Sequence, residues 1–206
     1  MTKLESRFSV ADVEILSRQN CHEGFLRIEK LHLKHRLFAG GWSEDLLREL
    51  LVKDEAVGVL LYDPGRDEVV LVRQFRTGAI VASSTPWMLE LVAGIVGEGE
   101  ELERVAIRES TEEADCVPTD LCKICDYLNS PGASNEKVTL FCGRIDSSGA
   151  GGVFGLTEEH EDIEVVVLAF SAALAAVESG EIHNAMSIIA IQWLALHKQE
   201  IRELWK

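Results

Sequence analysis

The sequence lacks any long apolar run, although 47% of its 206 residues are hydrophobic. A membrane-spanning helix needs roughly 18 consecutive apolar residues, and charged residues interrupt each run here before that length. Residues 1–13 are polar and include acidic side chains, so they do not have the apolar centre of a secretory signal. These absences predict a cytoplasmic protein without a membrane partner.

Basic residues are few and scattered. The chain has 20 lysines and arginines against 35 aspartates and glutamates, a net charge of −15. Such a surface repels phosphodiester backbones and anionic lipid, so a nucleic-acid partner is also not expected. An anionic substrate stays compatible with this charge, because metal ions and a few placed arginines can reverse the local field.

Cysteine is present five times, an odd number without the spacing of a disulfide framework. Cys122 and Cys125 form a C-x-x-C pair, but a zinc site needs two further ligands at a matching spacing, and none follow. We interpret all five as reduced thiols, and this pair as ordinary residues on or near a strand.

Hydrophobic periodicity predicts a mixture of strands and helices. Residues 13–37 predict two or three antiparallel strands with one apolar side, and Ser43 is expected to cap a short helix that reaches Leu51. Further strands are predicted at residues 56–62, 68–75, 87–92, 121–128, 137–144 and 163–170, and helices at 101–114, 171–179 and 184–205. Because strands and helices do not alternate strictly, we predict an α+β fold with a mixed sheet. The apolar side of the N-terminal sheet is expected to consist of Leu26, Ile28, Leu31 and Leu33.

The most informative segment is residues 94–116, GIVGEGEELERVAIRESTEEADC. On a helix, Leu102, Val105 and Ala106 form one apolar stripe. Continuing that stripe leads to Glu109 and Glu113. Carboxylates at positions where packing favours leucine are typical of a functional site.

The two carboxylates, four residues apart on one helix face, repel each other. A hard divalent cation would relieve this repulsion, because Mg²⁺ is usually held by one or two carboxylates together with phosphate oxygens. Arg108 precedes Glu112 by one helical turn and is expected to pair with it and orient it. Gly94, Gly97 and Gly99 suit a loop that approaches phosphate closely. The alternative is a solvated acidic face, which the interruption of the apolar stripe disfavours.

The same segment resembles the Nudix box, Gly-x5-Glu-x7-Arg-Glu-U-x-Glu-Glu-x-Gly-U, in which U is a bulky apolar residue. The matching residues are Gly94, Glu100, Arg108, Glu109, Glu112 and Glu113. Ser110 replaces the first U and Asp115 replaces the last glycine. Asp tolerates the left-handed conformation, so we expect a helix C-cap at Asp115.

Beyond the box, the chain resembles the bacterial ADP-ribose pyrophosphatase branch of the Nudix hydrolases. The resemblance runs from about Val13 to Trp205, although Ala133 stands where this branch usually has glycine. The stretches that carry it are GF (24–25), HRLFAG (35–40), DEVVLVRQFR (67–76), TPWMLELVAG (85–94), SPGASNE (130–136), GLTEEHEDI (155–163) and NAMSIIAIQWLALH (184–197).

This resemblance implies an α/β/α Nudix sandwich and Mg²⁺ as cofactor, with Mn²⁺ as a substitute. It implies that Glu109, Glu113, Glu161 and the Ala93 carbonyl bind metal. The catalytic residues implied are Glu159 as general base, Glu112 and Arg108. The substrate contacts implied are Phe25 on adenine, Arg48 and Arg76 on phosphate or ribose, Glu136 near the terminal ribose, Gly94 and Pro131.

Several of these residues have simpler alternatives: an acidic turn for Glu159 and Glu161, a core position for Phe25, and a strand end for Arg76. His160 is assigned no role.

The resemblance also implies residues 1–52 as a sheet region for dimerisation and adenine contact, and residues 53–206 as the Nudix hydrolase domain. A homodimer that shares the N-terminal sheet is expected. The implied reaction is hydrolysis of ADP-ribose to AMP and ribose 5-phosphate. Two alternatives stay open: a Nudix diphosphatase for a sugar nucleotide, NADH or a dinucleoside polyphosphate, and a non-catalytic nucleotide-sensing domain.

Overall fold

A computed structural model describes residues 6–206, and in it the chain forms two compact units. The smaller unit consists of residues 6–54 and Leu128–Glu136, and the larger one of Glu55–Tyr127 and Lys137–Lys206. The short segment from Leu128 therefore belongs with the N-terminal residues, which the sequence did not indicate.

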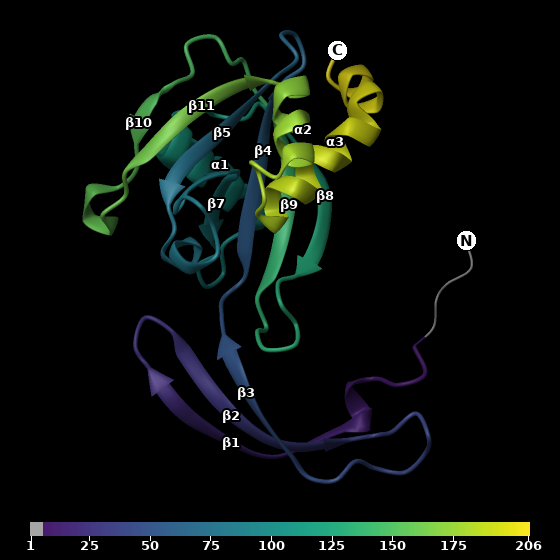
Figure 1. Ribbon diagram of the computed structural model, residues 1–206. Coiled ribbons are helices and arrows are strands. Elements are labelled where there is room, and N and C mark those ends of the chain that lie inside the picture. Colours follow the sequence, from purple (N-terminus) through teal and green to yellow (C-terminus); the bar gives the residue numbers. More distant parts are fainter. Residues whose placement is uncertain (1–5) are drawn as a thin grey trace. The chain divides into compact units, whose positions relative to one another are not determined.

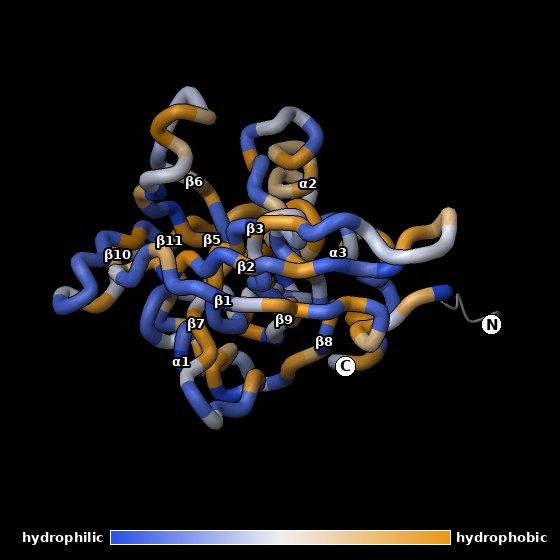
Figure 2. Tube along the Cα trace, turned by 90° about the horizontal axis from the view of Figure 1, so that it is seen from below, coloured by the Kyte–Doolittle hydropathy of each residue, from blue (hydrophilic) through white to orange (hydrophobic). Residues whose placement is uncertain are grey.

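The small unit is a three-stranded antiparallel sheet in the order β1-β2-β3 (Figure 1). A single 3-10 turn, η1 (Val10–Asp12), leads into it, and its strands are β1 (Val13–Glu23), β2 (Arg27–His35) and β3 (Leu46–Val52). The antiparallel strands predicted within residues 13–37 are confirmed as β1 and β2. Hydrophobic and hydrophilic stretches both occur along these strands (Figure 2).

The helix predicted from Ser43 to Leu51 is wrong, because this segment forms β3. Its leucines, spaced three and four apart, fit a helix, but so short a helix is marginal unless its apolar face is packed. Pairing with β2 from Leu46↔Leu33 to Val52↔Arg27 instead gives the backbone groups regular partners.

The single apolar side predicted for this sheet is also wrong. β2 pairs with β3 without a register shift, so its side chains alternate strictly between the two faces. Ile28 therefore lies on the face opposite to Leu31 and Leu33. Each face of the small sheet carries part of the apolar set.

The loop Leu128–Glu136 joins the small unit through β3. The Leu51 N–H donates to the Ala133 carbonyl at 2.8 Å, and the Lys53 N–H donates to Asn135 Oδ1 at 2.8 Å. The Asn135 amide also donates to the Lys53 carbonyl at 3.1 Å. One loop thus satisfies backbone groups at the end of β3.

The large unit is built on an eight-stranded mixed sheet, which confirms the predicted fold class. Six strands follow the order β10-β11-β5-β4-β9-β8, while β6 pairs with β5 and β7 pairs with β4. The β4–β9 pair is parallel. The strands are β4 (Ala56–Asp63), β5 (Glu68–Phe75), β6 (Trp87–Glu90), β7 (Val92–Ile95), β8 (Asp120–Leu128), β9 (Lys137–Arg144), β10 (Gly152–Phe154) and β11 (Ile163–Ala169).

Helices cover both faces of this sheet (Figure 1). The helix α1 (Leu102–Ala114) packs on one face over a cluster that includes Val70 and Val72, and α2 (Phe170–Ser179) with α3 (Ala185–Leu204) packs on the other over Leu71. Alternate side chains of β5 therefore belong to the hydrophobic clusters on opposite faces of the sheet, as strand geometry requires. This arrangement is the α/β/α sandwich, and the three helices predicted at residues 101–114, 171–179 and 184–205 are confirmed to within two residues.

The strand predicted at residues 87–92 is divided into β6 and β7. β6 pairs with β5, whereas β7 pairs with β4, and Leu91 stands at the change of partner. The buried Leu91 donates its N–H to Ser187 Oγ of α3 at 3.1 Å. A helix side chain thus satisfies the backbone at the break, and the break sets the position of β7 beside α1.

Short elements complete the large unit. They include two 3-10 turns, η2 (Thr77–Val81) and η3 (Thr157–Glu159), and the strand β10, which the sequence did not predict. All five cysteines are free, as expected. None of the helices formed by residues 6–206 has the length and apolarity that crossing a membrane requires.

Candidate active site

The apolar stripe of α1 continues into two glutamates, as the periodicity predicts. Val105 and Ala106 are fully buried against the sheet. One and two turns further, the side chains of Glu109 and Glu113 are only 12% and about 3% exposed. Both carboxylates therefore lie on the face of the helix that packs on the protein.

The two departures from the Nudix box are both accommodated. The buried Ser110 hydroxyl donates to the Ala106 carbonyl at 2.7 Å, so the polar group has a partner within the helix. Asp115 adopts the left-handed conformation, with φ 49° and ψ 33°, and its N–H donates to the Thr111 carbonyl. The predicted C-cap at Asp115 is confirmed.

Glu113 is the most enclosed carboxylate of the helix. It accepts a hydrogen bond from the Ala93 N–H of β7 at 3.0 Å. Burial, together with the charges of Glu109 and Glu161, raises the pKa of Glu113 to about 8, and the Ala93 hydrogen bond and the Arg76 charge oppose this rise. Three carboxylates and one arginine are thus close enough to act on each other electrostatically.

Glu109 lies directly against the backbone of Gly94. A Cβ atom at position 94 would overlap the Glu109 carboxylate, so this close approach requires glycine. Burial, followed by the charges of Glu112 and Glu161, raises the pKa of Glu109 despite the opposing Arg108 charge. The glycine of the box therefore has a local steric reason in this chain.

Arg108 forms ion pairs with three glutamates, and its predicted pairing with Glu112 is confirmed. Its Nη1 lies 3.1 Å from Glu112 and 2.7 Å from Glu109, and its Nη2 lies 3.4 Å from Glu100. Their charges keep the pKa of Arg108 above its ordinary value although burial lowers it. The guanidinium holds the box carboxylates in fixed positions and partly neutralises them.

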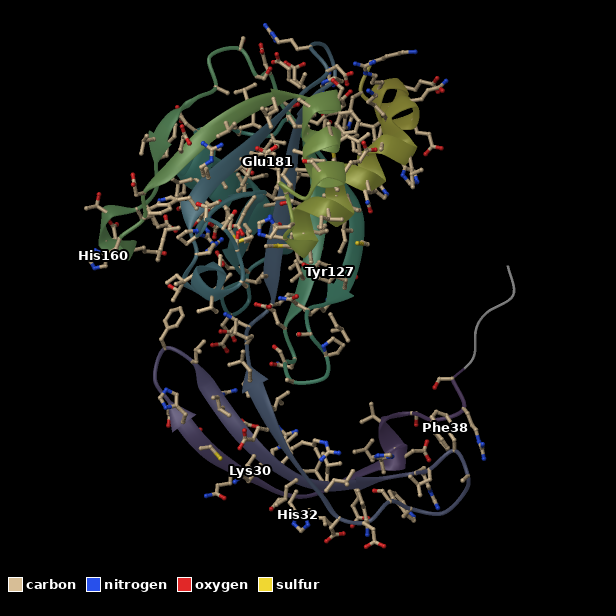
Figure 3. The ribbon with its side chains drawn as sticks, in the orientation of Figure 1. Lys30, His32, Phe38, Tyr127, His160 and Glu181 are labelled. Carbon is tan, nitrogen blue, oxygen red and sulfur yellow. The ribbon has the colours of Figure 1, made fainter. Side chains whose placement is uncertain are left out.

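Glu159 and Glu161 belong to the loop around η3, between β10 and β11. Glu161 accepts a hydrogen bond from the Leu156 N–H at 3.0 Å, and its charge reaches Glu109 and Glu113. Glu159 is exposed, and the left-handed residue His160 separates it from Glu161. His160 stands at the tip of the loop and points away from the sheet (Figure 3).

Arg76 continues from the end of β5 and binds Glu90 of β6, with Nε 2.6 Å from the carboxylate. The Glu90 side chain is 6% exposed, whereas that of Arg76 is 41% exposed. Sequence reasoning missed Glu90. The signal was present, because Glu90 shares a strand face with Met88 in an otherwise apolar stretch.

The remaining predicted substrate contacts lie in the small unit. Phe25 is 96% exposed in the turn between β1 and β2, so a core position for it is excluded. Arg48 is an exposed residue of β3 that donates to the Leu47 carbonyl at 2.9 Å. Pro131 and Glu136 belong to the loop that joins this unit, and Glu136 accepts from Asn129 at 2.5 Å.

The donor set of α1 fits a hard divalent cation. No three His, Cys, Asp or Glu side chains within residues 6–206 are arranged to hold a metal ion by themselves. Mg²⁺, however, usually takes one or two carboxylates and completes its shell with water and phosphate oxygens. Glu109 and Glu113 supply a pair of that kind, and because burial is the main cause that raises the pKa of both, a bound cation would stabilise their charged forms.

Comparison with known proteins identifies the family. The model of the NUDIX domain matches residues 52–203, which is most of the chain. The chain belongs to the NUDIX family. This membership agrees with the α1 carboxylates, the Gly94 contact and the sandwich fold described above.

Relatives extend the similarity over nearly the whole length. The chain is 42% identical over 198 residues to the ADP-ribose pyrophosphatase of Escherichia coli, covering 96% of this chain and 95% of the relative. It is 43% identical over 202 residues to that of Haemophilus influenzae, and the alignment covers 97% of this chain and 93% of the relative. A GDP-mannose pyrophosphatase of Salmonella typhimurium is 33% identical over 148 residues, with 71% and 76% covered.

A solved structure gives the same fold at low identity. It is described as the crystal structure of an ADP compounds hydrolase, and it covers 95% of this chain and 99% of its own chain. The TM-score is 0.72 and the identity is 18%. This likeness shows that the two chains share a fold.

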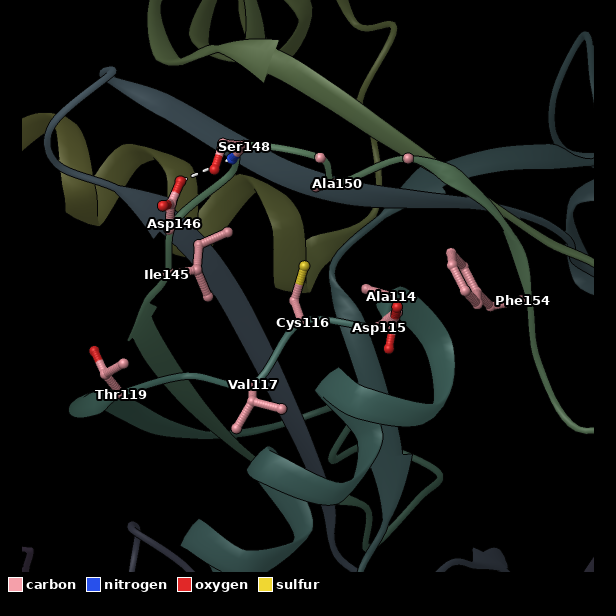
Figure 4. A pocket seen from close by; sticks show the side chains of 12 residues that line it. Ala114, Asp115, Cys116, Val117, Thr119, Ile145, Asp146, Ser148, Ala150 and Phe154 are labelled. Atoms are coloured by element: carbon pink, nitrogen blue, oxygen red, sulfur yellow. Dashed lines mark hydrogen bonds between the residues drawn. The ribbon is translucent and has the colours of Figure 1, made fainter.

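An open pocket of about 370 Å³ lies elsewhere in this NUDIX chain. It is lined by Ala114 at the end of α1, by Asp115 and Cys116 that follow the helix, and by the segment that carries Asp146 and Ser148 (Figure 4). None of its lining residues is a predicted metal, catalytic or substrate residue. The candidate active site is therefore defined by the α1 carboxylates and their partners, and not by this pocket.

Proposed function

We propose that this chain hydrolyses the pyrophosphate bond of ADP-ribose and releases AMP and ribose 5-phosphate. The observation that carries the proposal is the buried carboxylate pair of Glu109 and Glu113 in a chain that resembles ADP-ribose pyrophosphatases over nearly its full length. One water is consumed: its oxygen bonds to one phosphorus, the bond from that phosphorus to the bridging oxygen breaks, and the bridging oxygen leaves with the other phosphate.

In this proposal Glu109, Glu113, Glu161 and the Ala93 carbonyl hold Mg²⁺, for which Mn²⁺ is a substitute. When bound, the cation polarises the phosphoryl oxygens and makes water more acidic. Arg108 keeps Glu112 and Glu109 in place through the ion pairs described above. Arg76 binds Glu90 through Nε, which leaves its terminal nitrogens for a phosphate oxygen.

Glu159 is proposed as the general base. It is exposed and lies two residues from Glu161 in the same loop, and movement of the loop would bring it to substrate. It would take a proton from the water that attacks the adenosyl phosphorus, while the ribose 5-phosphate oxygen leaves. The loop would thus supply both a metal ligand and the base.

Phe25 is proposed as a contact to adenine, Arg48 to phosphate or ribose, and Glu136 to the terminal ribose. Pro131 is proposed as a further substrate contact, and Gly94 as a backbone contact to phosphate. The exposed ring of Phe25 is available for stacking on adenine. We further propose residues 1–52 as the dimerisation region, a homodimer that shares the small sheet, and a cytoplasmic location. A strictly monomeric mass in sedimentation would reject the dimer.

The deciding experiment incubates the purified protein with ADP-ribose in water enriched in ¹⁸O, with and without Mg²⁺. We expect AMP and ribose 5-phosphate only with the metal, and the label in AMP. Label in ribose 5-phosphate would place the attack on the other phosphorus. Intact ADP-ribose in the presence of Mg²⁺ would reject the proposed substrate.

A second candidate substrate is a sugar nucleotide, because a GDP-mannose pyrophosphatase is 33% identical over 71% of this chain. A panel of GDP-mannose, UDP-glucose, NADH and a dinucleoside polyphosphate would separate these possibilities by kcat/KM. Tight binding of ADP-ribose without hydrolysis would instead indicate a sensing domain. Retention of all the box carboxylates argues against that outcome.

A further inference from the structure

Gln74 carries an unpartnered buried amide. It is the last-but-one residue of β5 and is 8% exposed, and its Nε2 is enclosed without a hydrogen-bond partner. Within residues 6–206 it is the one enclosed side-chain nitrogen or oxygen of this kind. Buried polar groups nearly always have partners, since leaving one unpaired is costly. An orphan amide therefore needs an explanation.

Strand alternation places Gln74 on the α1 face of the sheet. Val72, two residues earlier, belongs to the core cluster under α1. Val72 pairs with Glu90, and Gln74 pairs with Met88, so these four side chains share one face. Gln74 is therefore on the same side of the sheet as the carboxylates of α1.

The neighbours of Gln74 are groups of the candidate active site. Two residues further along the chain, Arg76 binds Glu90 and acts electrostatically on Glu113. On the other edge of β5, Arg73 pairs with Glu164, and continuing that register brings Ile163 level with Gln74. Ile163 directly follows the loop that carries Glu161. The orphan amide thus lies where β5, β6 and the start of β11 meet.

We infer that Gln74 is a substrate-binding residue whose amide donates a hydrogen bond to a non-bridging oxygen of the pyrophosphate. The inference rests on the proposed function. An uncharged donor suits this place, because the surrounding glutamates and Arg76 already supply charges of both signs. The terminal torsion of glutamine is soft, so rotation of the amide can direct Nε2 towards a bound oxygen. Substrate would then supply the acceptor that the protein itself does not.

The test compares Gln74→Met, which keeps the length and removes the donor, with Gln74→Glu, which keeps the shape and accepts only. Gln199→Met on the exposed part of α3 is the matched control. Three quantities are measured: the melting temperature, kcat/KM for ADP-ribose with Mg²⁺, and the Kd of a methylene-bridged ADP-ribose analogue that cannot be hydrolysed.

A hydrogen bond to a charged oxygen corresponds to roughly a 10- to 100-fold effect. We expect Gln74→Met to melt at or above the wild-type temperature, and kcat/KM and analogue affinity to fall by about that factor. Gln74→Glu should lose more than Gln74→Met, since its carboxylate repels phosphate, and Gln199→Met should match wild type.

Wild-type kcat/KM and analogue affinity in Gln74→Met would overturn the inference and leave the amide a tolerated polar group. If Gln74→Met fails to fold, Gln74→Glu decides by the same two readouts. If the wild-type chain leaves ADP-ribose intact, the proposed function fails instead. The same series is then measured on the compound of the panel that the chain cleaves, and an unchanged Gln74→Met would again overturn the inference.

Discussion

The Glu113 carboxylate of α1 accepts a hydrogen bond from the Ala93 N–H of β7 at 3.0 Å. This contact joins the helix to the strand that also carries Gly94. It fixes one oxygen of Glu113 on protein backbone and leaves the other for the cation proposed above. The position of the carboxylate is therefore set before any ligand binds.

Replacement of Glu113 by glutamine should abolish most turnover and leave the protein folded. The amide keeps the volume but loses the charge that would hold Mg²⁺. Changes to groups that merely support metal ligands cost about 10- to 100-fold, so we expect a fall in kcat of at least ~100-fold. Glu103→Gln, an exposed change on the same helix, is the control. Near wild-type kcat in Glu113→Gln would remove this residue from the metal site.

Replacement of Gly94 by alanine should displace the Glu109 carboxylate, because the new methyl group would occupy its place. Misplacement of a catalytic group by about 1 Å costs on the order of 100-fold in rate. We therefore expect a roughly 10- to 100-fold fall in kcat/KM, with a small change in melting temperature. Gly78→Ala, where a Cβ meets no atom within 4 Å, should keep wild-type activity. Equal activities of both variants would show that the Gly94 contact has no functional weight.

The left-handed C-cap of α1 predicts an order of stability at position 115. Asp115→Ala should lower the free energy of unfolding by about 1 kcal/mol, because alanine lacks the local side-chain hydrogen bonding that lets Asp tolerate this conformation. Asp115→Gly should equal or exceed wild type, since glycine adopts it without strain. Urea denaturation of the three proteins measures the order. Alanine at wild-type stability would contradict it.

Asp63 predicts the response of the fold to acid. Its buried carboxylate accepts hydrogen bonds from the backbone of Gly65, Arg66 and Ser147 and from the Arg66 and Ser147 side chains. Burial alone would raise the pKa of Asp63, but these donors hold it well below its ordinary value of 3.8.

A folded-state pKa below the unfolded value means that the stabilisation is complete above about pH 4 and is lost as the pH falls further. Asp63→Asn should therefore lower the free energy of unfolding by about 2 kcal/mol at pH 7. It should also flatten the decline in stability between pH 4 and pH 2. Denaturation curves across that range test both effects. If the free energy of unfolding declined with pH equally in variant and wild type, Asp63 would not be the cause of the acid sensitivity.

The sequence was sufficient for the core of the site, because the α1 stripe and its glutamates depend on a local helical period. It was insufficient where pairing between distant segments decides. The leucines of Leu46–Val52 have helical spacing, but the segment pairs with β2 and forms a strand. The break at Leu91 depends on Ser187, almost a hundred residues later in the chain.

Two residues of the site region were missed for the same reason. Glu90 is visible in the sequence only as one acid within an apolar strand, and its partner Arg76 becomes evident through the β5–β6 register. Gln74 is adjacent to recognisable motif residues, but that its amide is both buried and unpaired is a property of the packed structure. Local patterns predict which residues carry charge, and the tertiary fold determines which of them lack a partner.

The attachment of loop Leu128–Glu136 to β3 means that the small unit is not separable by a single cut. A chain that began at Glu55 would lose the Leu51 N–H and both backbone groups of Lys53, which bind Ala133 and Asn135. The loop would then project from β8 and β9 with those groups exposed to water. Excision of the N-terminal sheet would therefore have to remove two stretches of sequence together, which makes the small sheet a discontinuous module.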